Sequence, residues 1–329
     1  MKHQLRRTLA LATLVASLVP LSAAAQGAAQ NYPNKPIRVV VPFAAGGAID
    51  PVVQLVGRKT QEVWGQQFVM DHRPGATGTI GSQLAAKAPA DGYTLLMCNN
   101  GSHSGITILN PKLPYDPIKD FTHISLGITY PALLVAHPSI QAKTVQELIT
   151  LAKTKPGQIN YASSGAGSSS HLGGEIFNSM AGVKLTHVPY KGNSLALTDL
   201  VSGQVQIMFS NIGPAMPFVK SGQLKILGVA SASRIPLLPD VPTVSESGLP
   251  GYLMGSWIGF CGPAGIPKDI VEKLNTDIVK ALKAPDVVAS FRALGVEPQP
   301  LTPEQSEAFV RRDIATSSQL IRQANIKID

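Results

Sequence analysis

Two short stretches of small residues constrain this chain more than any other feature. Residues 43–50 and residues 163–171 each follow a strand-like run and precede a helix-like run. Their glycines and serines let the backbone approach a guest molecule, and the first turn of the following helix offers N–H groups that have no partner inside the helix. Together with the positive end of the helix dipole, these donors favour a bound anion such as a carboxylate. A Ser/Gly-rich surface turn with an ordinary helix N-cap is the alternative for the second stretch.

Strand-like and helix-like segments alternate along the chain. Residues 36–42 have the β-branched run of a buried strand, and residues 51–64 have the pattern of a helix. Asp50 precedes a proline at the start of that helix, so we expect its carboxylate to be the N-cap rather than a ligand contact. Strands separated by helices predict an α/β fold in which each lobe holds a mainly parallel sheet flanked by helices.

Two further segments suggest where the chain passes between lobes. We interpret the extended residues 121–135 and the apolar residues 251–262 as the two crossings. A chain of 329 residues suits two lobes better than one. The expected division is a first lobe of residues 34–135 and 255–329 and a second lobe of residues 136–254.

The first 25 residues have the pattern of a secretory signal peptide. A basic head with Lys2, Arg6 and Arg7 precedes an apolar run and a small-residue cleavage site at Ala25. We therefore expect an exported mature protein. Loss of these three basic residues lowers the formal net charge from +8 to +5. Because the remaining basic residues are scattered, the sequence argues against a nucleic-acid surface.

Cys98 and Cys261 each end an apolar run. Export permits a disulfide between them, but two buried free thiols are the favoured interpretation, because unpaired cysteine packs readily in apolar cores. The cysteine spacing matches no zinc or redox motif, and the histidines show no metal-ligand spacing.

The serine-rich stretch also lacks the signatures of catalytic and nucleotide-binding loops. It has neither the third glycine of a dinucleotide fingerprint nor the Gly-Lys-Ser/Thr of a phosphate loop. Ser170 and His171 are adjacent on a predicted helix and point apart, unlike a nucleophile and its base. The sequence therefore predicts no catalysis, no cofactor and no metal.

If the two small-residue stretches face each other, they enclose a cleft at the carboxyl ends of the strands. Backbone N–H groups and serine hydroxyls can hold a carboxylate there, since each bond to a charged acceptor contributes about 1.5–3 kcal/mol. Polar side chains that end strands or lie in adjacent loops complete the predicted set. The predicted ligand-binding residues are Phe43, Ala44, Ala45, Gly46, Gly47, Asp50, Asn99, Ser163, Ser164, Gly167, Ser168, Ser169, Ser170, His171, Tyr190, Ser210 and Asn211.

Short motifs spread over the mature chain point to one family. They include Pro42-Phe43-Ala44-Ala45-Gly46-Gly47, Arg73-Pro74-Gly75-Ala76, Ala90-Asp91-Gly92-Tyr93-Thr94-Leu95-Leu96, Asn160-Tyr161-Ala162-Ser163-Ser164-Gly165, His187-Val188-Pro189-Tyr190-Lys191-Gly192 and Leu238-Pro239-Asp240-Val241-Pro242-Thr243. In this order the motifs resemble the Bug family, the periplasmic solute receptors of tripartite tricarboxylate transporters.

The resemblance implies a periplasmic-binding-protein (Venus-flytrap) fold whose two α/β lobes close on a small organic acid. It also implies that loop amides, small hydroxyls and ordered water hold the carboxylate, at residues 43–47 and 163–170 here, without an arginine clamp. The implied partners are the membrane subunits of a tripartite carrier, and we expect a monomer in the periplasm.

We therefore expect a periplasmic solute-binding protein that captures a carboxylate compound for transport and is not an enzyme. The alternative is a periplasmic sensor that delivers its closed, liganded form to a membrane signalling protein. A secreted hydrolase is a third class, and it requires turnover that depends on Ser170. The sequence leaves the identity of the acid open.

The chain departs from the family pattern at two positions near the expected cleft. Ser210 stands where many relatives have an aspartate after the strand, and Ile49 stands where they have threonine or serine. The loss of an acidic group disfavours an amino-acid ligand and favours a plain or bulkier acid.

We predict that aspartate and glutamate raise the melting temperature less than dicarboxylates without an amino group do, because Ser210 replaces an acidic group that could pair with the ammonium group of an amino acid. A thermal-shift comparison of aspartate with succinate, at equal concentration and pH, measures this difference. A larger shift with either amino acid contradicts the prediction.

Overall fold

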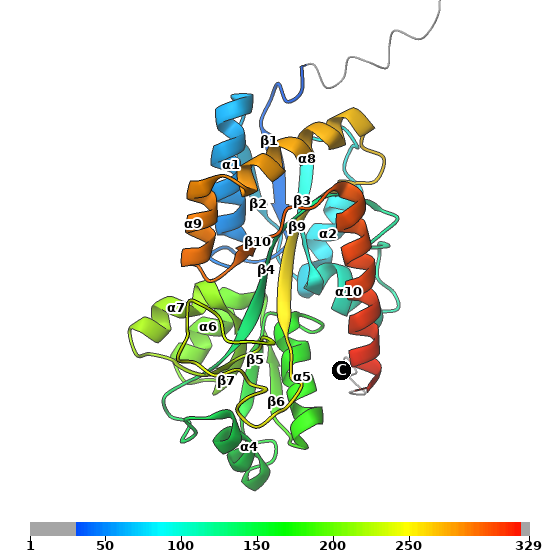
Figure 1. Cartoon of the computed structure of the whole chain (residues 1–329). Coiled ribbons are helices and arrows are strands. Elements are labelled where there is room, and N and C mark those ends of the chain that lie inside the picture. Colours follow the sequence, from blue (N-terminus) through cyan, green and yellow to red (C-terminus); the bar gives the residue numbers. More distant parts are fainter. Residues whose placement is uncertain (1–30, 324–329) are drawn as a thin grey trace, which may run out of the picture. The chain divides into compact units, whose positions relative to one another are not determined.

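The computed structural model describes residues 31–323. From Pro33 onward the chain belongs to one compact unit, whose helices and strands are labelled in Figure 1. The predicted signal peptide, residues 1–25, lies outside the described residues. Every described helix is too short or too polar to traverse a lipid bilayer.

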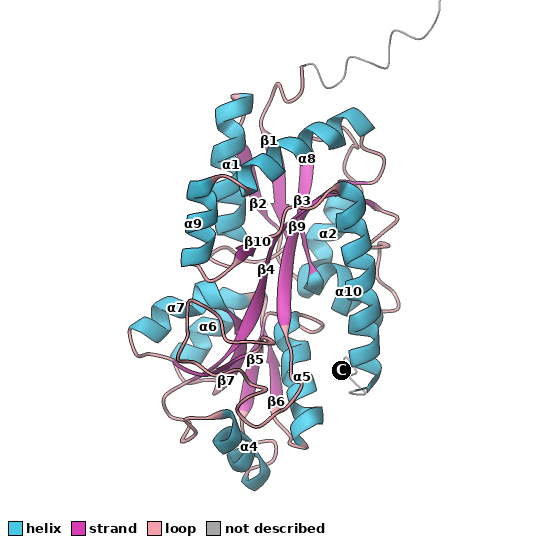
Figure 2. Ribbon diagram, viewed as in Figure 1, coloured by secondary structure: helices cyan, strands magenta, loops and turns pink. Residues whose placement is uncertain are grey.

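The first lobe is built on strands whose centre is a valine-rich run. Strand β1 pairs in parallel with β2 and β3, and β9 runs antiparallel to β3. The strands are β1 (Ile37–Val41), β2 (Phe68–His72), β3 (Thr94–Asn99) and β9 (Gly255–Pro263). The helices of this lobe, drawn in cyan in Figure 2, are α1 (Ile49–Trp64), α2 (Thr79–Ala86), α3 (Ile106–Leu109), α8 (Lys268–Leu282), α9 (Pro285–Ala293) and α10 (Pro303–Gln323). A short 3₁₀ helix, η2 (Ala76–Gly78), a short π-helix, η3 (Gly101–Gly105), and the small strand β10 (Glu297–Pro298) complete it.

The second lobe repeats the strand–helix alternation. Strand β5 pairs in parallel with β6 and β7. Its strands are β5 (Asn160–Ser163), β6 (Thr186–Pro189), β7 (Ile207–Asn211) and β8 (Lys225–Val229). Its helices are α4 (Val145–Thr154), α5 (Ser169–Ala181), α6 (Asn193–Val201) and α7 (Ile212–Lys220).

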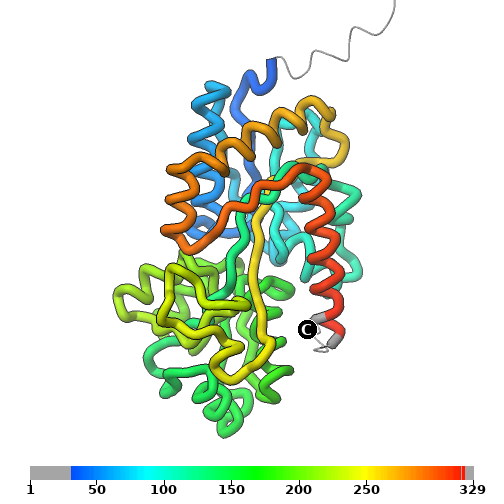
Figure 3. Tube along the Cα trace, in the orientation of Figure 1, coloured from blue at the N-terminus to red at the C-terminus, as the bar shows by residue number. Residues whose placement is uncertain are grey.

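One long strand, β4 (Phe121–Ala136), joins the two lobes. Its first part runs antiparallel to β9, from the pair Phe121 and Pro263 to the pair Pro131 and Gly255. Its last part runs antiparallel to β7 and β8 in the second lobe. Figure 3 shows β4 and β9 side by side along the trace. The crossing strands thus add antiparallel pairs between the parallel βα units, and the predicted two-lobed α/β fold is confirmed. The lobe boundaries by residue number stay a prediction.

The helix that follows the serine-rich loop packs tightly on its own sheet. A Cβ at Gly174 of α5 would lie 2.2 Å from the ring of the buried Tyr161 in β5, so a larger residue would push the helix away. Phe177 of α5 packs on Phe209 and Tyr252, and the Tyr252 hydroxyl donates to the carbonyl of Gly173 at 2.8 Å. This packing fixes where the N-terminus of α5 lies.

Side-chain caps fix the starts of α4 and α10. Thr302 and Gln305 exchange side-chain-to-backbone hydrogen bonds at the start of α10, a full capping box. Thr144 accepts from the backbone of Glu147, whose carboxylate reaches back to the N–H of Lys143. The predicted N-cap role of Asp50 is wrong and is described with the site.

The favoured interpretation of the cysteines as free thiols is also wrong. Cys98 of β3 and Cys261 of β9 form a disulfide between two paired strands. Both residues are buried, with His123 of β4 against the Cys261 sulfur at 3.4 Å. Sequence separation gave no sign of this proximity, because β9 returns to the first lobe 163 residues after β3.

We predict that the double variant Cys98→Ala/Cys261→Ala loses about 2–5 kcal/mol of unfolding free energy, because the bridge restricts a long loop in the unfolded chain. Urea unfolding with and without dithiothreitol measures this loss. The double variant is the control, since reductant should not destabilise it further. Equal stability of both proteins, or two titratable thiols in the unreduced, unfolded wild type, contradicts the assignment.

Candidate functional site

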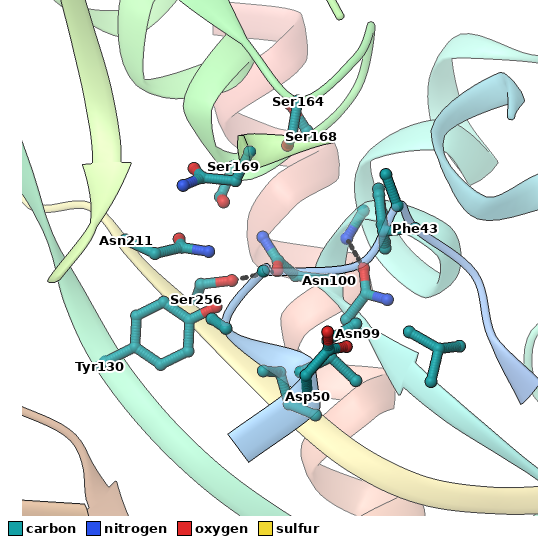
Figure 4. A pocket seen from close by; sticks show the side chains of 18 residues that line it. Phe43, Asp50, Asn99, Asn100, Tyr130, Ser164, Ser168, Ser169, Asn211 and Ser256 are labelled. Atoms are coloured by element: carbon teal, nitrogen blue, oxygen red, sulfur yellow. Dashed lines mark hydrogen bonds between the residues drawn. The ribbon is translucent and has the colours of Figure 1, made fainter. Parts of the chain in front are cut away.

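A cavity lies where the two lobes meet, with about 520 Å³ of space that is partly open to solvent (Figure 4). Both small-residue stretches contribute to its lining. The predicted residues that line it are Phe43, Ala44, Gly47, Asp50, Asn99, Ser164, Ser168, Ser169 and Asn211. Their contact with a ligand stays a prediction. The predicted residues that the structure places outside this lining are Ala45, Gly46, Ser163, Gly167, Ser170, His171, Tyr190 and Ser210.

Four of the described α-helices begin at this cavity. Helix α1 contributes Asp50 of its first turn, and α5 contributes Ser169 of its first turn. Asn193 is the first residue of α6, and Asn211 is the N-cap of α7. Because the first N–H groups of each helix lack intrahelical partners and its dipole is positive there, the cavity is suited to an anion.

Asp50 is not the N-cap that the sequence suggests. Helix α1 begins two residues earlier than predicted, at Ile49, with Ala48 at the N-cap and no side-chain cap bond. The Asp50 carboxylate instead accepts from the Gly46 N–H at 2.7 Å and faces His72 Nε2 at 3.0 Å. Asp50 therefore fixes the turn of residues 43–48, and it also borders the cavity.

The serine-rich turn is held by hydrogen bonds among its own residues. Ser168 is the N-cap of α5, where its hydroxyl donates to the carbonyl of Gly165 at 2.6 Å and accepts from the N–H of His171 at 3.3 Å. The Ser170 hydroxyl accepts from the Ser164 N–H at 2.9 Å. Ser170 thus shapes the turn, whereas Ser164, Ser168 and Ser169 border the cavity.

The two lobes touch through the tips of their turns. The Thr77 hydroxyl donates to the carbonyl of Ala166 at 2.5 Å, and the Ser194 hydroxyl donates to the carbonyl of Ala45 at 3.0 Å. A Cβ at Gly105 would lie 2.0 Å from the carbonyl oxygen of Gly167, so only glycine permits this approach. These contacts bring the two turns to opposite sides of one cavity.

Two stacked histidines support the serine-rich turn from behind. The rings of His171 and His187 lie 4.1 Å apart, and Gly167 donates its N–H to His171 Nδ1 at 3.0 Å. Burial lowers the pKa of His171 to about 4. Burial, and then the neighbouring His171, lower the pKa of His187 to about 3. Both rings are therefore neutral at pH 7.

The serine–histidine pair of Ser163 and His187 is poorly suited to catalysis. Ser163 Oγ and His187 Nε2 are 2.6 Å apart, but Ser163 is fully buried and outside the cavity lining. The low pKa of His187 makes it a weak base near neutral pH. Ser170 and His171 each bond to backbone N–H groups of the turn rather than to one another.

Tyr190 and Ser210 lie just outside the cavity. The Tyr190 hydroxyl donates to Asp199 at 2.7 Å, and burial raises the pKa of Tyr190 to about 12. Ser210 is fully buried and accepts from the side-chain amide of Asn193 at 3.4 Å. Ser210 therefore orients a lining residue, Asn193, that the sequence prediction missed.

Several polar lining residues besides Asn193 were also missed. Asn100 accepts from the Ser256 hydroxyl at 2.6 Å, and Tyr130 pairs with Ser256 across β4 and β9 (Figure 4). Burial raises the pKa of Tyr130 to about 12. Tyr130 and Ser256 could have been found in the sequence as polar residues inside the two predicted crossing segments. Asn100 follows Asn99 directly at the end of β3.

The lining is rich in hydrogen-bond donors and poor in charge. Among the described residues that form it, Asp50 is the sole carboxylate and neither lysine nor arginine occurs. Asparagine amides, serine hydroxyls and helix N–H groups supply the donors instead. Such a site can bind a small organic acid without neutralising it by an ion pair.

Comparison with known proteins identifies the family. The model of the tripartite tricarboxylate transporter family receptor matches residues 52–326. This chain belongs to that receptor family. The receptor is 33% identical over 306 residues to protein BugT of Bordetella pertussis, a match that covers 93% of this chain and 94% of BugT. The resemblance to Bug proteins is thereby confirmed.

Solved structures agree with this assignment. The receptor superposes on R. palustris Rpa4515 with adipate at a TM-score of 0.88 and 35% identity, covering 90% of this chain and 99% of that one. MatC from Rhodopseudomonas palustris with bound malate gives a TM-score of 0.83 and 35% identity, covering 88% and 100%. These matches confirm the periplasmic-binding-protein fold of the receptor.

We predict that His171 makes the receptor less stable in acid. The unfolded chain binds a proton at this side chain near the ordinary pKa of 6.5, whereas the folded chain does so near 4. Stability is therefore complete above pH 6.5 and falls as the pH drops towards 4, by about 2 kcal/mol between pH 7 and pH 5.

Urea unfolding of ligand-free protein at both pH values tests the role of His171. The His171→Asn variant keeps an acceptor near the Gly167 N–H but cannot gain the proton. Between pH 7 and pH 5 it should therefore lose about 2 kcal/mol less unfolding free energy than the wild type. Parallel pH profiles of wild type and variant contradict the prediction.

Proposed function

We propose that this receptor captures a small organic carboxylate in the periplasm and passes it, unchanged, to the membrane subunits of a tripartite carrier. The observation that supports this most is the convergence of four helix N-termini on one cavity with no lysine or arginine in its described lining. The cavity offers many donors and one carboxylate that already accepts from Gly46 and faces His72. The carboxylate of an acid can therefore accept hydrogen bonds from these donors in place of water, and no basic side chain is needed beside it.

The relatives support the same class of ligand. Rpa4515 is described with adipate and MatC with malate, each 35% identical to this chain. Both ligands are small carboxylic acids. We propose that the carboxylate here lies between residues 43–50 and 163–170, with Asn99, Asn100 and Asn211 as additional donors.

The remaining parts of the proposal concern place and assembly. We propose that residues 1–25 direct export and are removed, and that the mature receptor works as a monomer. The first lobe then comprises residues 34–135 and 255–329, and the second lobe residues 136–254. Contacts such as Thr77 with Ala166 join the lobe tips around the cavity, as expected for a receptor that closes on its ligand.

We predict that a thermal-shift screen finds a carboxylate that stabilises the receptor, by about 2.7 kcal/mol at a ligand concentration 100 times Kd. The Ser169→Ala variant should then bind that acid about tenfold more weakly, since it loses one hydroxyl donor to a charged acceptor. Calorimetric titration measures both affinities.

The matched control is Ser179→Ala, an exposed serine at the other end of the same helix, which should bind as the wild type does. No shift with any mono-, di- or tricarboxylate contradicts the proposed function. Uptake of the acid by cells that lack the receptor tests its role in transport. Unchanged uptake with an altered transcriptional response to the acid indicates the sensor instead.

A further inference from the structure

A second cavity, with about 560 Å³ of space that is partly open to solvent, adjoins the polar one on the side of β4. Its walls come from β4, the starts of α1 and α7, the end of α9 and the segment that follows α9. Apolar side chains such as Ile128, Phe291, Leu294 and Val296 line it, and no charged residue is found in its described lining. This composition differs from that of the donor-rich cavity beside it.

The two cavities share part of their walls. Gly47, Ala48, Tyr130 and Asn211 line both. Tyr130 and Asn211 lie along the same side of the polar cavity in Figure 4. A molecule held by its carboxylate in the polar cavity therefore has an apolar space next to it, bordered by Tyr130 and Gly47.

We propose that the apolar cavity receives the hydrocarbon part of the ligand, so that the preferred ligand is a monocarboxylate with an apolar body, such as a medium-chain aliphatic or an arylalkyl acid. This inference rests on the proposed function. Burial of each methylene group favours binding by about threefold to fourfold. A second carboxylate at the far end of the ligand would enter a space without charged partners, which is costly.

Chain length provides the first test. Hexanoate should bind about tenfold tighter than butyrate, because two more methylene groups leave water. Hexanoate should also bind tighter than adipate, which has the same length and a second carboxylate. Phenylacetate, an arylalkyl acid, should likewise bind tighter than butyrate. Calorimetric titration at pH 7.5, where these acids are ionised, gives the dissociation constants.

Gly213 offers a matched pair of variants. It lines the apolar cavity but not the polar one, and a Cβ there would keep ordinary distances of 3.7 Å and 3.9 Å from Leu294. Gly213→Leu should fill the space and remove most of the advantage of hexanoate over butyrate. Gly213→Ala adds one methyl group and should keep most of it. In the opposite sense, Leu294→Ala should enlarge the cavity and favour octanoate.

Butyrate is the internal control in every variant, because it reports on the polar cavity and on folding. If butyrate binds but hexanoate is no tighter, or if Gly213→Leu leaves the advantage of hexanoate unchanged, the inference is wrong while the proposed function stands. Tighter binding of adipate than of hexanoate also overturns the inference. If no carboxylate binds the wild type, both the inference and the proposed function fail.

Discussion

The first N–H groups of an α-helix cannot be satisfied within that helix, and four α-helices of this receptor begin at one cavity. The arrangement has an electrostatic consequence, because each helix start carries a partial positive charge. Asp50 offsets part of that field inside the first turn of α1, where it also fixes the Gly46 N–H. The rest of the field is left for a guest, which explains how a site without lysine or arginine in its described lining suits an acid.

The scaffold keeps these helix starts in place from both lobes. Strand β4 belongs to both lobes, and β9 pairs with β4 and with β3. The disulfide between Cys98 and Cys261 links β3 to β9 close to the end of β3, where Asn99 and Asn100 border the cavity. In the second lobe, the close packing of Gly174 on Tyr161 fixes the start of α5. The strands and the packing of α5 thus determine where the short turns of the site lie.

Local sequence predicted the elements and the two turns well, because strand, turn and helix signals act over a few residues. The N-cap role of Asp50 was wrong, since a carboxylate in a first turn can also bind the preceding loop, and only the fold shows that His72 lies beside it. The disulfide depends on two strands 163 residues apart, which no local pattern reveals. Tyr130 and Ser256 were missed because residues inside crossing strands resemble core positions until the lobes are in place.

The most direct test is a crystal structure of the receptor with the acid that stabilises it most. We predict that N–H or hydroxyl donors of residues 43–50 and 163–170 hold the carboxylate. Each donor should lie about 2.7–3.2 Å from a carboxylate oxygen or from one bridging water molecule. A carboxylate held by lysine or arginine side chains outside this cavity would contradict the account.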